Sequence, residues 1–114
     1  MQDLTLINDQ LNGKHLFDAF KLQLTKDFEQ SNFQADFIAS LEPDYASIHE
    51  KLVDELQRAE KRADSTVMHL LNRIDISEFQ LKKYLNEQRN ENRLTVIAEL
   101  IIKRVLQKVV IKEF

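Results

Sequence analysis

Apolar residues recur every three or four positions along most of the chain, which is the spacing of one face of an α-helix. The first such segment runs from about Lys14 to Gln30, and a second, shorter one precedes Pro43. Proline disfavours helical backbone in the residue before it, so the shorter segment should end there. The pattern predicts a first helix over 14–30 and a short helix or helical turn over about 33–41.

The longest apolar stripe follows Pro43. Its members share one arc of the helical wheel: Tyr45, Ile48, Leu52, Leu56, Ala59, Ala63, Val67, Leu70 and Ile74. This pattern predicts one long helix over about 43–74, which would be about 48 Å from end to end. A compact domain of this chain length is only about 34 Å across. The helix must therefore bend, or its end must project towards a partner.

A corner is predicted after this helix. Ser77 and Gln80 have the spacing of a capping box, and Ile76 and Leu81 have that of a hydrophobic staple. We therefore expect a short helix over about 78–86. The polar, asparagine-rich stretch 86–93 then predicts a connecting loop.

The closing segment is apolar on two sides. Between Leu94 and Ile111, 12 of 18 residues are apolar, and a helix of this kind packs on two sides. We predict a largely buried C-terminal helix over about 93–112. Its second apolar strip surrounds an arginine with aliphatic residues, as protein interfaces often do. The expected partner-binding residues are Ile97, Leu100, Arg104, Lys108 and Ile111.

Composition narrows the fold class. One glycine and one proline in 114 residues are too few for the turns of a β-rich protein, and both are excluded from helix interiors. We predict an all-α, single-domain bundle of four or five helices over 13–114, preceded by a loosely ordered N-terminus at 1–12. There is no cysteine and no basic region followed by an apolar run at the start, so a cytoplasmic protein is expected.

Charge is divided unevenly between the two halves. The first 57 residues contain 11 acidic residues and 4 Lys or Arg, whereas the remaining 57 contain 8 and 12. The acidic half can pack against the basic half within one bundle. Alternatively, the basic residues near the C-terminus form a partner-binding surface.

Motifs for chemistry are missing. No Glu-x-x-His pair, zinc-protease motif, glycine-rich phosphate loop or nucleophile elbow is present. His15 and Asp18 could provide two metal ligands, but two ligands do not make a metal site. His49 is expected to be half-exposed. We expect no metal, cofactor or small-molecule ligand and no catalysis. An enzyme with an unrecognised site is retained as an alternative.

Nucleic acid and membrane are the remaining partner classes. The helix over 77–85 could serve a DNA-associated regulator, with Lys82 and Lys83 facing outward. Its first residue is Glu78, however, and the net charge of −3 weakens attraction to phosphates, so nucleic acid is not expected. The last segment contains Glu99, Lys103, Arg104 and Lys108, so it is not a membrane span.

Two C-terminal stretches, MHLLNRIDISEFQLKKYL and VIAELIIKRVLQKVVIKEF, carry a resemblance. They resemble small bacterial all-helical proteins with an LLxRIDIxE corner and a C-terminal AELIIxRxLQKV helix. That resemblance covers about 45 residues. It implies no activity, because no activity is associated with such proteins. The sequence therefore favours a non-catalytic helical interaction module, a small adaptor or regulator. Its partner would be another protein or a second copy in a homodimer.

Overall fold

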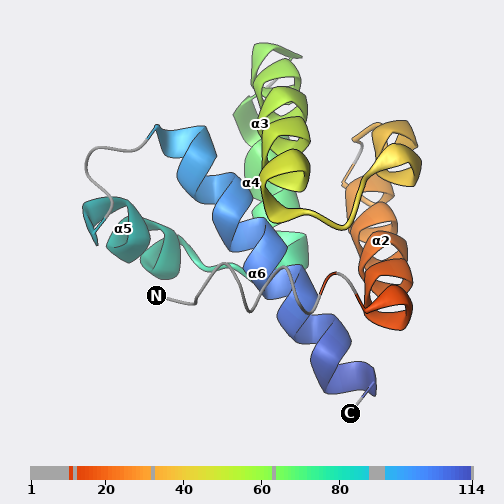
Figure 1. The fold of residues 1–114 in the computed structure, drawn as a ribbon. Helices are drawn as coiled ribbons and strands as arrows, with labels where there is room; N and C mark the ends of the chain where they lie inside the picture. The colour runs from red at the N-terminus through yellow and green to blue at the C-terminus, as the bar shows by residue number, and fades with distance from the viewer. Residues whose placement is uncertain (1–10, 12, 32, 63, 88–91, 114) are drawn as a thin grey trace.

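The computed structural model describes residues 11, 13–31, 33–62, 64–87 and 92–113 of the chain. Over these residues it contains helices and no strand, as the sequence predicts (Figure 1). The elements are α2 (Lys14–Glu29), η1 (Asp36–Ser40), α3 (Tyr45–Arg62), α4 (Asp64–Ile74), α5 (Glu78–Glu87) and α6 (Arg93–Glu113). The all-α prediction is therefore confirmed.

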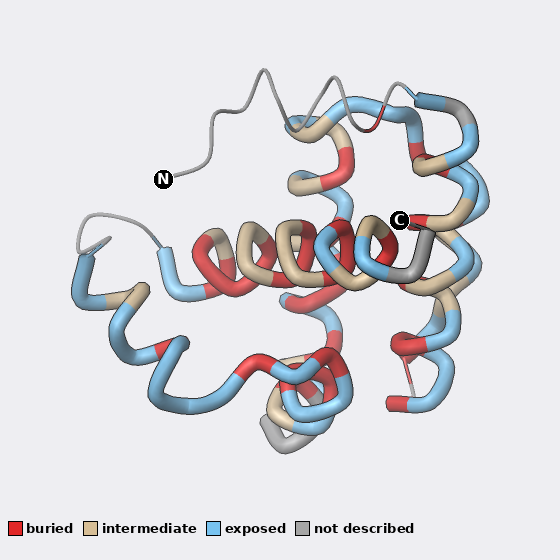
Figure 2. Tube along the Cα trace, turned by 90° about the horizontal axis from the view of Figure 1, so that it is seen from below, coloured by how far each residue is buried: buried red, intermediate tan, exposed pale blue. Residues whose placement is uncertain are grey.

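The last helix lies at the centre of the bundle. α6 packs against α2, α3, α4 and α5, and Figure 1 shows it crossing between them. In Figure 2 buried and half-buried residues line almost the whole of α6, whereas most of α5 is exposed. The prediction of a largely buried C-terminal helix is confirmed. Its core residues are Leu94, Val96, Ile97, Ala98, Ile101, Ile102, Val105, Leu106 and Val109.

The prediction of a single long helix over 43–74 is wrong. The apolar stripe is divided between α3 and α4, and α4 runs in a different direction from α3 (Figure 1). A straight helix over 45–74 would be about 45 Å long, more than the 34 Å of the molecule's longest extent. Asp64, Ser65 and Thr66 explain the position of the break, since these residue types favour helix starts over helix interiors.

Both parts of the stripe are buried. Ile48, Leu52 and Leu56 of α3 and Val67, Leu70 and Ile74 of α4 are all fully buried. Each apolar Å² removed from water contributes about 25 cal/mol, so this burial stabilises the arrangement of the two helices. The longest extent is 34 Å, so the described part of the chain contains no straight helix of about 45 Å whose end could project towards a partner.

The beginning of the chain lies mostly outside the described residues. The predicted loose N-terminus at 1–12 includes only Leu11 among them, and Leu11 is buried in the core. The radius of gyration is 13.3 Å, close to the value of about 13 Å for a compact domain of this length. None of the described helices is long and apolar enough to cross a membrane.

Candidate functional site

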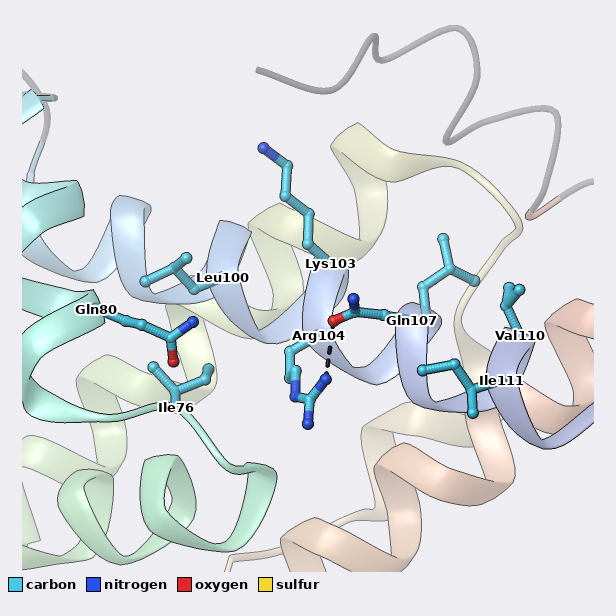
Figure 3. Close-up of a pocket in the computed structure, with 9 residues that line it drawn as sticks. Ile76, Gln80, Leu100, Lys103, Arg104, Gln107, Val110 and Ile111 are labelled. Carbon is cyan, nitrogen blue, oxygen red and sulfur yellow. Dashed lines mark hydrogen bonds between the residues drawn. The ribbon is translucent and has the colours of Figure 1, made fainter.

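A groove of about 420 Å³ lies between the start of α5 and the second half of α6. We call it the α5–α6 groove. Its lining residues are Ile76, Gln80, Leu100, Lys103, Arg104, Leu106, Gln107, Val110 and Ile111. Figure 3 shows Ile76 and Leu100 at one end, Val110 and Ile111 at the other, and Arg104 with Gln107 between them. The groove thus has two apolar ends and a polar centre.

The corner before α5 fixes one wall of this groove. Asp75 has a left-handed backbone with φ of 73°, and the Ile76 N–H donates to the Leu71 carbonyl at 2.9 Å. This is a helix C-terminal motif that usually holds glycine at the left-handed position. It turns the chain so that Ile76 is buried beside α6.

The predicted capping box then starts α5. The Gln80 N–H donates to Ser77 Oγ at 3.1 Å, and the Ser77 N–H donates to Gln80 Oε1 at 3.2 Å. Both residues of the predicted staple, Ile76 and Leu81, are buried. The cap therefore holds Gln80 in place at the groove wall, and this part of the site was readable from the sequence.

Arg104 occupies the centre of the groove with incomplete pairing. Its Nη1 donates to Gln107 Oε1 at 2.8 Å, whereas its Nη2 is 3.7 Å from Asp75 Oδ2. Its Nε is buried and finds no acceptor in the described part of the chain. A buried N–H without an acceptor costs about 1–3 kcal/mol. The outer nitrogens belong to a side chain that is 31 % exposed, so they are the atoms that a carboxylate of a partner would bind.

The groove brings together three of the five predicted partner-binding residues. Leu100 is half-buried and packs partly on the core, Arg104 lies at the centre, and Ile111 is 66 % exposed. The other two belong elsewhere. Ile97 is fully buried and was wrongly placed on the surface, because the apolar face of α6 is wider than the sequence pattern suggested. Lys108 turns towards α2 instead.

Lys108 reaches a buried carboxylate that the sequence analysis missed. Asp27 on α2 is 1 % exposed, and its Oδ2 accepts a hydrogen bond from Lys108 Nζ at 3.3 Å. Gln23 Nε2 donates to Oδ1 at 3.1 Å, and Arg73 Nε on α4 is 4.0 Å from the same oxygen. The carboxylate therefore links α2, α4 and α6, which is a structural role.

The signal for Asp27 was present in the sequence. It follows Phe20 by seven residues and Leu24 by three, so it lies on the apolar face of its helix. Glu55 has the same relation to Ile48 and Leu52, is 5 % exposed, and accepts a hydrogen bond from Arg58 at 3.0 Å. An acidic residue in register with an apolar stripe marks a buried, paired carboxylate.

A second polar cluster joins α3, α5 and α6. Lys103 Nζ donates to Glu99 Oε1 and to the Tyr84 hydroxyl, each at 2.8 Å. On the α3 side, the rings of Tyr45 and His49 stack, and His49 Nε2 is 2.8 Å from the Thr95 carbonyl oxygen. His49 is half-buried, as expected.

Two groups of this cluster, Lys103 and Tyr45, hold their protons more tightly than usual. Burial lowers the pKa of Lys103, but its hydrogen bonds to Glu99 and Tyr84 act against burial, and the pKa is raised overall. Burial, and then the charge of Glu99, raise the pKa of the Tyr45 hydroxyl. A lysine and a tyrosine with raised pKa values stay protonated, and in that form they are weak nucleophiles and bases.

Metal ligands do not gather anywhere in the described ranges: no group of three or more His, Cys, Asp or Glu side chains could hold an ion there. His15 and Asp18 are both exposed on α2. No family model, curated protein or solved structure matches the chain. The resemblance to small bacterial helical proteins therefore stays a prediction.

Proposed function

We propose that this chain is a non-catalytic helical interaction module, a small adaptor or regulator, and that the α5–α6 groove binds its protein partner. The observation that carries the proposal is the groove's arrangement: two apolar ends around the incompletely paired Arg104. Protein interfaces combine apolar anchors with arginine in this way. A matching partner segment places apolar side chains on either side of a carboxylate.

The accessible wall of the groove supports the same proposal. Ile111 is 66 % exposed at one end, where an isolated aliphatic side chain contributes nothing to the core. Covering it removes apolar surface from water at about 25 cal/mol per Å². The polar cluster around Lys103 is already hydrogen-bonded within the fold, which supports a binding role over a catalytic one.

Selection from a random peptide library displayed on phage tests this proposal. The full chain is immobilised, and the affinities of enriched peptides are then measured by fluorescence anisotropy. We expect peptides with apolar residues flanking Asp or Glu, bound at least tenfold more weakly by Ile111→Glu, a change of about 1.4 kcal/mol. Leu22→Glu is the matched control, because Leu22 is 74 % exposed on α2 and does not line the groove.

Two results of this selection would overturn the proposal. One is that no peptide is enriched by the chain immobilised as a monomer, in which no second copy fills the groove. The other is that the enriched peptides bind Ile111→Glu as tightly as the wild type. Circular dichroism of each variant checks that the substitution at an exposed position leaves the helices intact.

A DNA-associated regulator is the second candidate. It rests on the exposed Lys82 and Lys83 of α5, although Glu78 and Glu87 lie on the same helix. A fluorescence titration with duplex DNA at low and moderate salt decides it. Salt-sensitive binding that Lys82→Glu/Lys83→Glu abolishes would support this candidate, and no binding at low salt would end it.

A further inference from the structure

An exposed aromatic side chain lies next in sequence to a residue of the α5–α6 groove. Phe79 is 77 % exposed and lies in the first turn of α5, next to the groove residue Gln80. Only three large apolar side chains of the described residues are exposed to this degree: Leu22, Phe79 and Ile111. Two of the three thus belong to the groove region. Phe79 is an exposed ring, and Ile111 is part of the groove wall.

Charge near this ring complements charge in the groove. Glu78, directly before Phe79, is exposed, and the side chain of Arg104 in the groove is 31 % exposed. The nearest carboxylate to Arg104, that of Asp75, is 3.7 Å from Nη2 and mostly exposed. The dipeptide Glu78–Phe79 therefore carries a carboxylate and an apolar ring, the two groups that the groove is built to take.

We propose that a second copy of this chain occupies the groove. Phe79 of each copy enters the Val110–Ile111 end of its partner's groove, and the Glu78 carboxylate binds the partner's Arg104. Since ring and groove lie in one region of a single chain, the contact is made twice about a two-fold axis, as in a self-complementary dimer. This inference rests on the proposed protein-binding role of the groove.

The available space fits this occupant. A cavity of about 150 Å³ holds one benzene ring, and the groove measures about 420 Å³. The total volume is therefore large enough for one phenyl ring and a glutamate side chain. Insertion also covers Ile111 and Phe79 together, so two exposed apolar side chains leave water in each half of the contact.

Sedimentation equilibrium over a dilution series tests the assembly. We expect the wild type to form dimers, and Phe79→Glu and Ile111→Glu each to raise the dimer Kd at least tenfold. Leu22→Glu is expected to leave the Kd unchanged. All three positions are exposed, so the variants should fold. A wild type that remains monomeric up to about 1 mM, or a dimer that neither Phe79→Glu nor Ile111→Glu weakens, overturns the inference.

Cross-linking tests the predicted contact directly, because the chain contains no cysteine. Phe79→Cys and Ile111→Cys proteins are mixed and oxidised, and we expect a disulfide-linked heterodimer. A disulfide requires Cα atoms within about 7 Å, so a mixture of Leu22→Cys with Ile111→Cys is the control. Cross-linking no greater than in that control contradicts the insertion of Phe79.

Charge reversal tests the proposed ion pair. Glu78→Arg and Arg104→Glu should each weaken the dimer, and the double variant should restore it, because both halves of each pair are then exchanged. No restoration contradicts the pairing of Glu78 with Arg104. Groove-binding peptides together with a monomeric wild type would keep the proposed function and overturn the second copy as occupant. A monomer that also selects no peptide overturns both.

Discussion

Two cations one turn apart on α6 lie in very different surroundings. Lys108 Nζ is 3.3 Å from the carboxylate of Asp27, a residue that is 1 % exposed. Arg104 Nη2 is 3.7 Å from the carboxylate of Asp75, whose side chain is 77 % exposed. Water screens the second pair and hardly reaches the first. We infer that Lys108 stabilises the fold, whereas Arg104 remains available to a partner.

The difference depends on which helix lies opposite each cation. α2 presents a buried acid to Lys108, and the chain corner before α5 presents only an exposed one to Arg104. Both cations are half-buried, so exposure alone would not separate them. The burial of the acidic partner makes the distinction.

Removing the buried charge should have the largest effect. Asp27→Asn keeps the shape of the side chain but leaves Lys108 and Arg73 without their countercharge. We expect a loss of about 2 kcal/mol in the free energy of unfolding. This is less than the 3–5 kcal/mol for fully buried pairs, since the Lys108 and Arg73 side chains are 20 % and 47 % exposed.

Urea unfolding monitored by circular dichroism measures this loss. Asp18→Asn is the matched control, because Asp18 is an exposed carboxylate on the same helix, and it should change stability by less than about 0.5 kcal/mol. Equal effects of the two substitutions would show that Asp27 has no special role.

Matched substitutions of the two cations provide the next test. Lys108→Met leaves a buried carboxylate without its nearest cation and should cost about 1–2 kcal/mol. Arg104→Met removes a buried N–H that has no acceptor in the described part of the chain, and it also removes the hydrogen bond to Gln107 and the ion pair with Asp75. These effects oppose each other, so the net change should be within about 0.5 kcal/mol. The same urea titration compares them. If Arg104→Met is as costly as Lys108→Met, Arg104 is part of the fold, and the groove loses its centre.

The sequence predicted the local elements better than their arrangement. The first helix, the turn before Pro43, the capped α5 and the buried α6 follow from periodicity and from caps, which act over a few residues. The break between α3 and α4 does not disturb the apolar period, so the stripe from Tyr45 to Ile74 read as one helix. The position of the break depends on which helices the second half of the stripe, in α4, can pack against.

The site was only partly predictable for a related reason. Helical spacing brought Leu100, Arg104 and Ile111 onto one strip of α6, and they do line one groove. The other wall comes from Ile76 and Gln80, and no local pattern reports which distant elements meet. Ile97 and Lys108 fit the same strip. However, Ile97 is buried in the core, and Lys108 contacts Asp27 of α2.

Alkaline pH should destabilise the protein, because Lys103 of α6 and Tyr45 of α3 retain their protons in the fold. The pKa values of Tyr45 and Lys103 are raised from their ordinary values of 10.0 and 10.5. Above about pH 10 the folded chain binds more protons than the unfolded one, so stability falls as pH rises. One such group costs at most about 1.4 kcal/mol per pH unit.

Urea titrations from about pH 8 to about pH 11 measure this slope. We expect Tyr45→Phe and Lys103→Met each to flatten it, whereas Lys82→Met, at an exposed position, should leave it unchanged. At neutral pH the stabilisation from Lys103 is fully present, so Lys103→Met should be less stable than the wild type there. A flat wild-type profile would contradict the raised pKa values.

The smallest expected effect is at Asp75, the weak partner of Arg104. Its left-handed backbone, with φ of 73°, is a conformation that glycine adopts without steric cost. Asp75→Gly should therefore stabilise the fold by about 0.5 kcal/mol, and Asp75→Ala should destabilise it by about 0.5–1 kcal/mol. Both variants remove the same carboxylate, so the difference between their urea midpoints isolates the backbone. Should both be destabilised equally, the carboxylate itself would matter, and Arg104 would be held by the fold as Lys108 is.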